Sequence, residues 1–224
     1  MGQTARELEL KLRSSLKHGT LVKDITSTSH HGKKHTFMTT AAMIDRVADN
    51  RPGKAKIAAT NFNKGENVDA LLAEAIKGKQ LRKIADWATD DKSPDVQPFH
   101  FDMGRNIGYG VRLWYDALEH FKTKEMAIVL QKDKDTALGF SVLTAYPSTK
   151  DFSKMEFTQL NLSEGLHNSY AYKYASPERR TYLDNAVEKG VHRKHNYTNI
   201  PLMRNVDMPS LRQNEAPAPE AGFA

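Results

Sequence analysis

The sequence predicts an α+β fold with N-terminal helices, a small central antiparallel sheet and a C-terminal helical extension. Three observations predict it. Up to residue 91 the chain holds segments whose apolar side chains recur at helical spacing, whereas residues 99–147 are rich in glycine, aromatic and alternating apolar residues. Residues 151–210 again have a mainly helical composition. Because helical and strand segments are separated along the chain, the pattern is typical of α+β rather than α/β folds.

The first elements are predicted to be two helices joined by a loop. Thr4 and Glu7 have the spacing of a capping box, and leucines then recur every four residues until Gly19, which predicts one amphipathic helix. Residues 24–35 are polar and without period, so they predict a loop. Residues 36–50 predict a second helix.

The middle of the chain is predicted to change from helix to sheet. The apolar period of residues 66–91 is interrupted at Gly78, which predicts either one kinked helix or two short ones. Residues 115–123 predict another short helix. Two apolar runs, residues 125–133 and 138–147, flank a polar turn and predict a β-hairpin.

The domain organisation follows from these elements. Residues 1–150 are predicted to form one domain of helices and a small sheet, and residues 151–210 a mainly helical extension packed on it. Within the extension, Pro177 is suited to the first position of a helix. Residues 211–224 are rich in proline and alanine and lack a core pattern, so we expect them to be disordered.

Composition excludes several classes of protein. The chain has 224 residues with 39% hydrophobic content, enough to bury a core, and no cysteine, which excludes disulfides, cysteine nucleophiles and cysteine-containing zinc sites. No run approaches the roughly 20 apolar residues of a membrane span, and no signal peptide is evident, so a soluble protein is expected. The absence of cysteine fits a reducing environment, so a cytoplasmic location is expected. A net charge of +6 suggests an anionic partner.

The nine histidines raise the question of a metal site. His30, His31 and His35 lie in one basic segment, and His192 and His195 are three residues apart. Neither group matches a dedicated metal motif, and the neighbouring lysines and arginines would repel a cation. We therefore expect a solvated basic loop and helix end, with no metal and no cofactor.

The sequence GFSVLTAYP, residues 139–147, ends an apolar strand in two hydroxyl side chains. Alternation predicts that Phe140, Val142 and Thr144 lie on one face of this strand and that Tyr146 continues it. The two hydroxyls then share a side of the sheet. They are either ordinary polar residues at a sheet edge or part of a site.

Two other residues of the sheet region carry chemistry. His100 lies between two phenylalanines, so alternation places it opposite the core, as a polar surface residue or as a general base. Arg105 lies in a glycine-rich segment that fails the phosphate-loop and dinucleotide patterns and predicts a turn, from which it can bind phosphate. With the two hydroxyls they supply what RNA cleavage without a metal requires.

The element order and the strand ending resemble a known enzyme family. A helical portion followed by the strands GRNIGYGV, MAIVLQKD and GFSVLTAYP is similar to the barnase/EndoU/colicin/RelE-like ribonucleases of bacterial toxins and phage-borne proteins. Many of those domains have a strand ending of the form vTAYP, matched here by Val142 to Pro147 with Leu143 as the inserted residue. The resemblance covers about residues 30–150 and leaves the C-terminal extension unexplained.

The resemblance implies a metal-independent RNA endonuclease of toxin, effector or phage-borne type. It implies that Thr144 and Tyr146 are the strand-end hydroxyls, that Arg105 binds phosphate, and that His35 or His100 is the acid/base histidine. The expected partners are RNA, with tRNA as one candidate, and an inhibitor or host protein; no membrane is expected.

Two alternatives remain open. The chain is also compatible with a non-catalytic nucleic-acid-binding protein, or with a phage or effector protein that binds a host protein through the tyrosine-rich residues 168–174. The basic run near residue 80 is either a solvated helix face or a nucleic-acid contact. The side chains predicted to bind nucleic acid are Lys33, Lys34, Lys77, Lys79, Arg82, Lys83 and Arg112.

Overall fold

The described part of the chain contains both helices and strands, and two short strands, residues 58–62 and 156–158, lie outside the predicted sheet region. The computed structural model describes residues 4–25, 38–49, 56–148, 150, 155–158 and 160–192. The helices are α1 (Ala5–Lys17), α2 (Leu21–Ile25), α4 (Thr40–Val47), α5 (Val68–Ala75), α6 (Lys79–Thr89), α7 (Ser163–Asn168), α8 (Tyr170–Lys173) and α9 (Pro177–His192). The strands are β1 (Ala58–Phe62), β2 (Val96–Asp102), β3 (Gly108–Trp114), β4 (Ala117–Thr123), β5 (Glu125–Lys132), β6 (Phe140–Pro147) and β7 (Glu156–Thr158). The predicted α+β class is confirmed.

The strands form two antiparallel sheets where the sequence predicted one. One sheet has the order β1-β3-β4-β7 and the other β2-β5-β6. The predicted hairpin is confirmed as β5 and β6. The helix predicted over residues 115–123 is wrong, because this segment is β4, which pairs with β3 and with β7. Pairing on both sides overrides the weak helical pattern of so short a segment.

The N-terminal helices follow their local sequence signals. At the start of α1, the backbone N–H of Thr4 donates to Glu7 Oε2 over 2.8 Å, and the N–H of Glu7 donates to Thr4 Oγ1 over 3.3 Å, so the predicted capping box is confirmed. Residues 66–91 form two helices, because Gly78 adopts a φ of +60° between α5 and α6, which no helix continues through.

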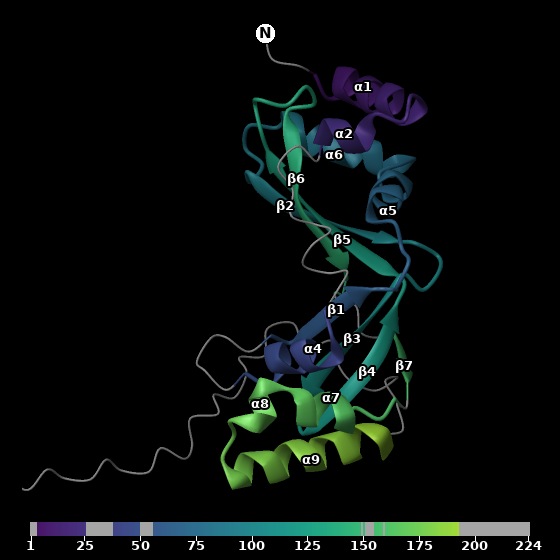
Figure 1. Cartoon of the computed structure of the whole chain (residues 1–224). Coiled ribbons are helices and arrows are strands. Elements are labelled where there is room, and N and C mark those ends of the chain that lie inside the picture. Colours follow the sequence, from purple (N-terminus) through teal and green to yellow (C-terminus); the bar gives the residue numbers. More distant parts are fainter. Residues whose placement is uncertain are drawn as a thin grey trace, which may run out of the picture. The chain divides into compact units, whose positions relative to one another are not determined.

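Each sheet packs with its own cluster of buried apolar side chains. Figure 1 labels the helices and strands that contribute to the two clusters. Helices α1, α2, α5 and α6 pack with the inward side chains of β2, β5 and β6. Helices α4, α7 and α9 pack with β1, β3 and β4, so the helices that follow residue 150 cover the second sheet. No helix in the described ranges is long and apolar enough to cross a membrane. The predicted boundary near residue 150 stays a prediction, and residues 211–224 lie outside the described residues.

Two glycines of the segment GRNIGYG lie inside β3 and allow a close approach of backbones. A Cβ atom at Gly108 would lie 2.6 Å from Asn61 O and 2.6 Å from Pro147 Cγ, and one at Gly110 would lie 2.6 Å from Ala59 O. Gly108 therefore lets the end of β6 pack against β3. The glycines serve chain packing rather than phosphate binding, and Gly104, with a φ of +69°, makes the predicted turn.

Arg112 and Glu119 form an ion pair inside the β1-β3-β4-β7 sheet. Arg112 Nε donates to Glu119 Oε2 over 2.6 Å, and the two side chains are only 2% and 1% exposed. The guanidinium also lies 4.5 Å from the ring centre of Phe157. The expectation that Arg112 binds nucleic acid is wrong, because a phosphate cannot reach a buried guanidinium that already holds a carboxylate.

We predict that Arg112→Met lowers the free energy of unfolding by about 3–5 kcal/mol, because it leaves the Glu119 carboxylate buried without its cation. The double variant Arg112→Met/Glu119→Leu should recover most of this loss, since it removes both buried charges. Urea unfolding at neutral pH measures both values. A single variant within about 1 kcal/mol of the wild type would contradict the importance of this pair.

Candidate functional site

Three strands bring His100, Thr144 and Tyr146 to one face of the β2-β5-β6 sheet. His100 on β2 pairs with Ala127 on β5, and Ala127 pairs with Tyr146 on β6, so the three residues form one row across the sheet. Thr144 pairs with Val129 two residues along β5, and therefore lies in the next row of the same face. We call this side of the sheet, defined by His100, Ala127, Thr144 and Tyr146, the His100 face; Ala127 is fully buried, and the other three are partly exposed.

A β-bulge at Leu143 determines which side of β6 faces the core. Val142 and Thr144 pair with consecutive residues of β5, although Leu143 stands between them and is 44% exposed. Val142 and Thr144 therefore point to opposite faces, and the prediction that they share one is wrong. The prediction that Thr144 and Tyr146 share a side is confirmed. Leu143, the inserted residue of the strand ending, is the bulge residue.

Hydrogen bonds through the buried residue Ser148 hold the ring of His100 in position. Its Nδ1 atom lies 2.8 Å from Oγ of Ser148, which is fully buried. The N–H of Ser148 donates to Glu125 O over 2.7 Å, and Thr123 Oγ1 donates to Ser148 O over 3.0 Å. Lys150 donates its backbone N–H to Ser148 Oγ over 3.2 Å. The backbone N–H, the carbonyl and the hydroxyl of Ser148 are thus all hydrogen-bonded, so Ser148 can orient the imidazole.

The surroundings of His100 favour its neutral form. Burial is the main cause that lowers the pKa of His100 below its ordinary value, and the positive charge of Lys150 lowers it further. The carboxylate of Glu125 acts in the opposite direction but does not reverse the shift. At neutral pH the ring is therefore uncharged. When Nδ1–H donates to Ser148 Oγ, Nε2 carries the lone pair that a general base needs.

Ser148 and Lys150 were not predicted from the sequence. Both follow the strand ending directly, where a serine and a lysine are ordinary loop residues. Their relation to His100 depends on the pairing of β2, β5 and β6, which bring residues 100 and 148 within hydrogen-bond distance. The polarity of the segment after Pro147 was the only local signal.

Arg105 forms an ion pair with Glu66 and does not belong to the His100 face. Its Nη1 donates to Glu66 Oε1 over 2.6 Å and its Nη2 to Glu66 Oε2 over 3.2 Å, while Glu74 lies 3.8 Å away. The hydrogen bond to Glu66 is the main cause that raises the pKa of Arg105. A phosphate would have to displace these carboxylates. The phosphate-binding role predicted for Arg105 stays a prediction.

The remaining predicted residues divide into two groups. Lys77, Lys79, Arg82 and Lys83 are exposed on and just before α6. His35, Lys33 and Lys34 lie outside the described residues. In the part of the chain that the structure describes, no group of three or more histidine, aspartate or glutamate side chains is placed to hold a metal ion.

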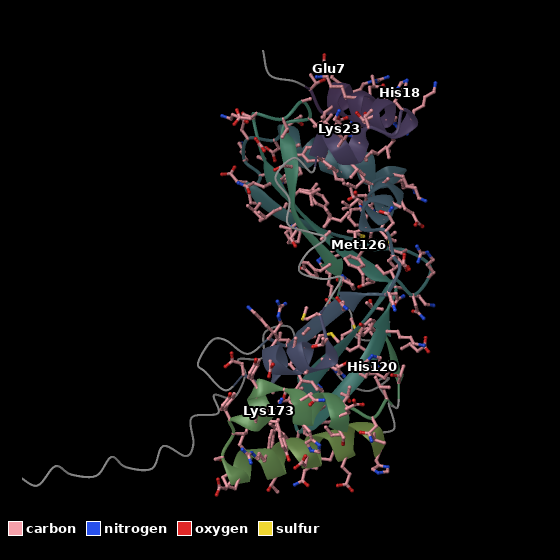
Figure 2. The ribbon with its side chains drawn as sticks, in the orientation of Figure 1. Glu7, His18, Lys23, His120, Met126 and Lys173 are labelled. Atoms are coloured by element: carbon pink, nitrogen blue, oxygen red, sulfur yellow. The ribbon has the colours of Figure 1, made fainter. Side chains whose placement is uncertain are left out.

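A second partly buried histidine, His120, lies on the other sheet. Figure 2 labels His120 on β4, where its Nδ1 lies 2.5 Å from Thr158 Oγ1. Burial, followed by the charge of Lys122, lowers the pKa of His120 to about 4. Its ring stands 5.8 Å from that of Tyr109, whose hydroxyl accepts from Asn61 Nδ2 over 3.0 Å. This face packs against α4, α7 and α9, which leaves His120 less suited than His100 to contact a substrate.

Two comparisons with known proteins gave a match. A family model described as the bacterial CdiA-CT RNAse A domain matches residues 29–147, more than half of the chain. A solved structure, the CdiA-CT/CdiI complex from Y. kristensenii 33638, contains a chain that is 19% identical, with a TM-score of 0.45. That match covers 54% of this chain and 99% of the other. No curated protein matches. The family match spans every residue that defines the His100 face.

We predict that Lys150→Gln raises the pKa of His100, because it removes a positive charge that disfavours the imidazolium. Titration of the ring Cε1 proton by NMR measures the shift, with the signal assigned through a His100→Ala variant. Lys173→Gln, on α8, is the matched control and should leave the titration unchanged. An unchanged or lower pKa in the Lys150 variant would show that this lysine does not act on the ring.

Proposed function

We propose that this chain, which belongs to the bacterial CdiA-CT RNAse A domain family and is a ribonuclease of a bacterial toxin, cleaves RNA without a metal ion on the His100 face. Family membership confirms the recognition of a toxin ribonuclease from the strand ending. One observation carries the proposed site: His100 and Tyr146 stand in one row of the sheet with only Ala127 between them.

The distance between His100 and Tyr146 across β5 suits the binding of one phosphate by both side chains. Neighbouring strands lie about 4.8 Å apart, so the backbones of His100 and Tyr146 are about 10 Å apart across β5. Ala127 contributes only a methyl group between them. The longer side chains of His100 and Tyr146 are partly exposed and can both contact one phosphate, and Thr144 in the next row adds a second hydroxyl.

The chemistry needs a base, a charge stabiliser and an acid. Neutral His100 can take the proton of the ribose 2′-hydroxyl, whose oxygen then attacks phosphorus and expels the 5′-oxygen, leaving a 2′,3′-cyclic phosphate. The hydroxyls of Thr144 and Tyr146 can donate hydrogen bonds to the non-bridging oxygens as charge builds on them, and Lys150 adds a positive charge nearby. The departing 5′-oxygen takes up one proton.

A second acid/base group completes the scheme. His35 lies within the family match but outside the described residues, and it is the other histidine proposed to act. Either it is the acid that protonates the 5′-oxygen, or it is the base and His100 is the acid. Arg105 is retained as a phosphate ligand that would first have to leave Glu66. All of these groups ionise or donate without a metal ion.

RNA is the proposed substrate, with tRNA among the candidates, and an inhibitor protein is the proposed second partner. A ribonuclease that acts in the cytoplasm would also attack the RNA of the cell that makes it. Such a cell needs a protein that blocks the site. A complex in which the inhibitor covers the His100 face would satisfy this need most directly.

We predict that the purified protein cleaves total RNA and tRNA in excess EDTA. His100→Ala and Thr144→Ala should each lower kcat/KM by about 10²–10⁴-fold, because each removes a group that acts in the transition state. His18→Ala is the matched control, since its ring contacts Ser14 of α1, and it should retain wild-type activity.

The outcomes separate the parts of the proposal. Cleavage that requires added Mg²⁺ would contradict the metal-independent mechanism. A fully active His100→Ala variant together with an inactive His35→Ala variant would move the acid/base role to His35 and reject the assigned base. No cleavage under any condition would contradict the proposed function.

A further inference from the structure

Two surface hollows meet at Lys79. The first, of about 580 Å³, lies between α1 and α6, and its walls include Arg13, Arg82 and Lys83. The second, of about 430 Å³, runs from Lys77 and Lys79 to the end of β2. Both hollows border Lys79, so they are neighbours at the start of α6, and we call the two together the depression.

Positive charge is in excess along this depression. Arg13 holds Glu9 over 2.6 Å, and Arg82 holds Asp86 over 2.9 Å, so these cations are partly neutralised. Lys77, Lys79 and Lys83 are exposed, and none of the three forms an ion pair with another described residue. We call these three lysines the α6 lysines.

The depression begins next to the strand that carries the candidate base. Phe101, Asp102, Met103 and Gly104, which line the second hollow, directly follow His100 on β2. At about 3.3 Å per residue, the chain from His100 to Gly104 spans about 13 Å. Helix α6 packs on the face of the sheet opposite His100, and β2 is the edge strand of this sheet. A polyanion bound at His100 would therefore reach the α6 lysines by passing around the edge of β2.

The surface chemistry fits an RNA backbone better than an acidic protein. Interfaces between proteins are anchored by aromatic and large apolar side chains. Across the described ranges, α6 contributes no exposed large hydrophobic residue and α1 contributes one, Leu10, which does not line the first hollow. Lysine is a point charge on a flexible stem, which suits contact with phosphates irrespective of base sequence.

We propose that the α6 lysines bind the phosphodiester backbone of the RNA substrate outside the cleaved phosphate. This inference rests on the proposed function, and it adds a substrate-binding track to the catalytic face. It accounts for how a site that holds one phosphate gains affinity for a long RNA. Each lysine adds a phosphate contact whose strength falls as salt rises.

The test compares a long RNA with a ribodinucleotide as substrates for Lys77→Gln/Lys79→Gln/Lys83→Gln. We expect KM for the long RNA to rise at least tenfold, kcat to change less than twofold, and the advantage of the long RNA over the dinucleotide to shrink. The slope of log KM against log salt should decrease by about 2, because each of the three lost phosphate contacts contributes about 0.7 to this slope. Replacement of the same three lysines by arginine should restore KM.

The matched control removes three exposed lysines elsewhere, with Lys56→Gln/Lys134→Gln/Lys173→Gln. The inference would be overturned if the α6 variant had the same KM and the same salt slope as this control. That result is also the one expected if the α6 lysines bind a protein partner instead of RNA. If the wild type cleaves no RNA, the proposed function fails separately. Fluorescence anisotropy with a 2′-deoxy oligonucleotide then still decides whether the α6 lysines bind a nucleic-acid backbone.

Discussion

The unpaired residue Leu143 in the β5-β6 ladder is the constraint on which the candidate site depends. A regular strand that buries Val142 would also bury Thr144, and an unpaired hydroxyl in an apolar core is costly. The bulge shifts the alternation by one residue, so Ala145 enters the core while Thr144 and Tyr146 turn to the His100 face. One extra residue thus lets a single strand supply both core and site.

The rest of the fold supports this arrangement from two sides. The inward face of the β2-β5-β6 sheet packs with four helices, which fixes the strands that carry the row. At the far end of β6, Pro147 packs on Gly108, and Ser148 is held by Thr123 and Glu125. The hydrogen bond from Ser148 to His100 therefore links the position of the imidazole to both sheets.

The sequence was informative where structure is set locally. The capping box of α1, the break at Gly78, the hairpin and the shared side of the two hydroxyls follow from neighbouring residues. The register of the strands does not, so the bulge, the strand nature of β4 and the role of Ser148 were missed. Burial of Arg112 was missed for the same reason, since its partner Glu119 lies on the adjacent strand.

The place where a phosphate binds shows whether the His100 face is the site of RNA cleavage. A 2′-deoxy dinucleotide cannot be cleaved through a 2′-hydroxyl, so its binding can be followed by NMR on the wild-type protein. Binding on the His100 face should produce saturable shifts of the Ala127 methyl and of the His100 ring and Thr144 signals. Saturable shifts confined to the other sheet, around His120, with the Ala127 methyl unmoved, would contradict it.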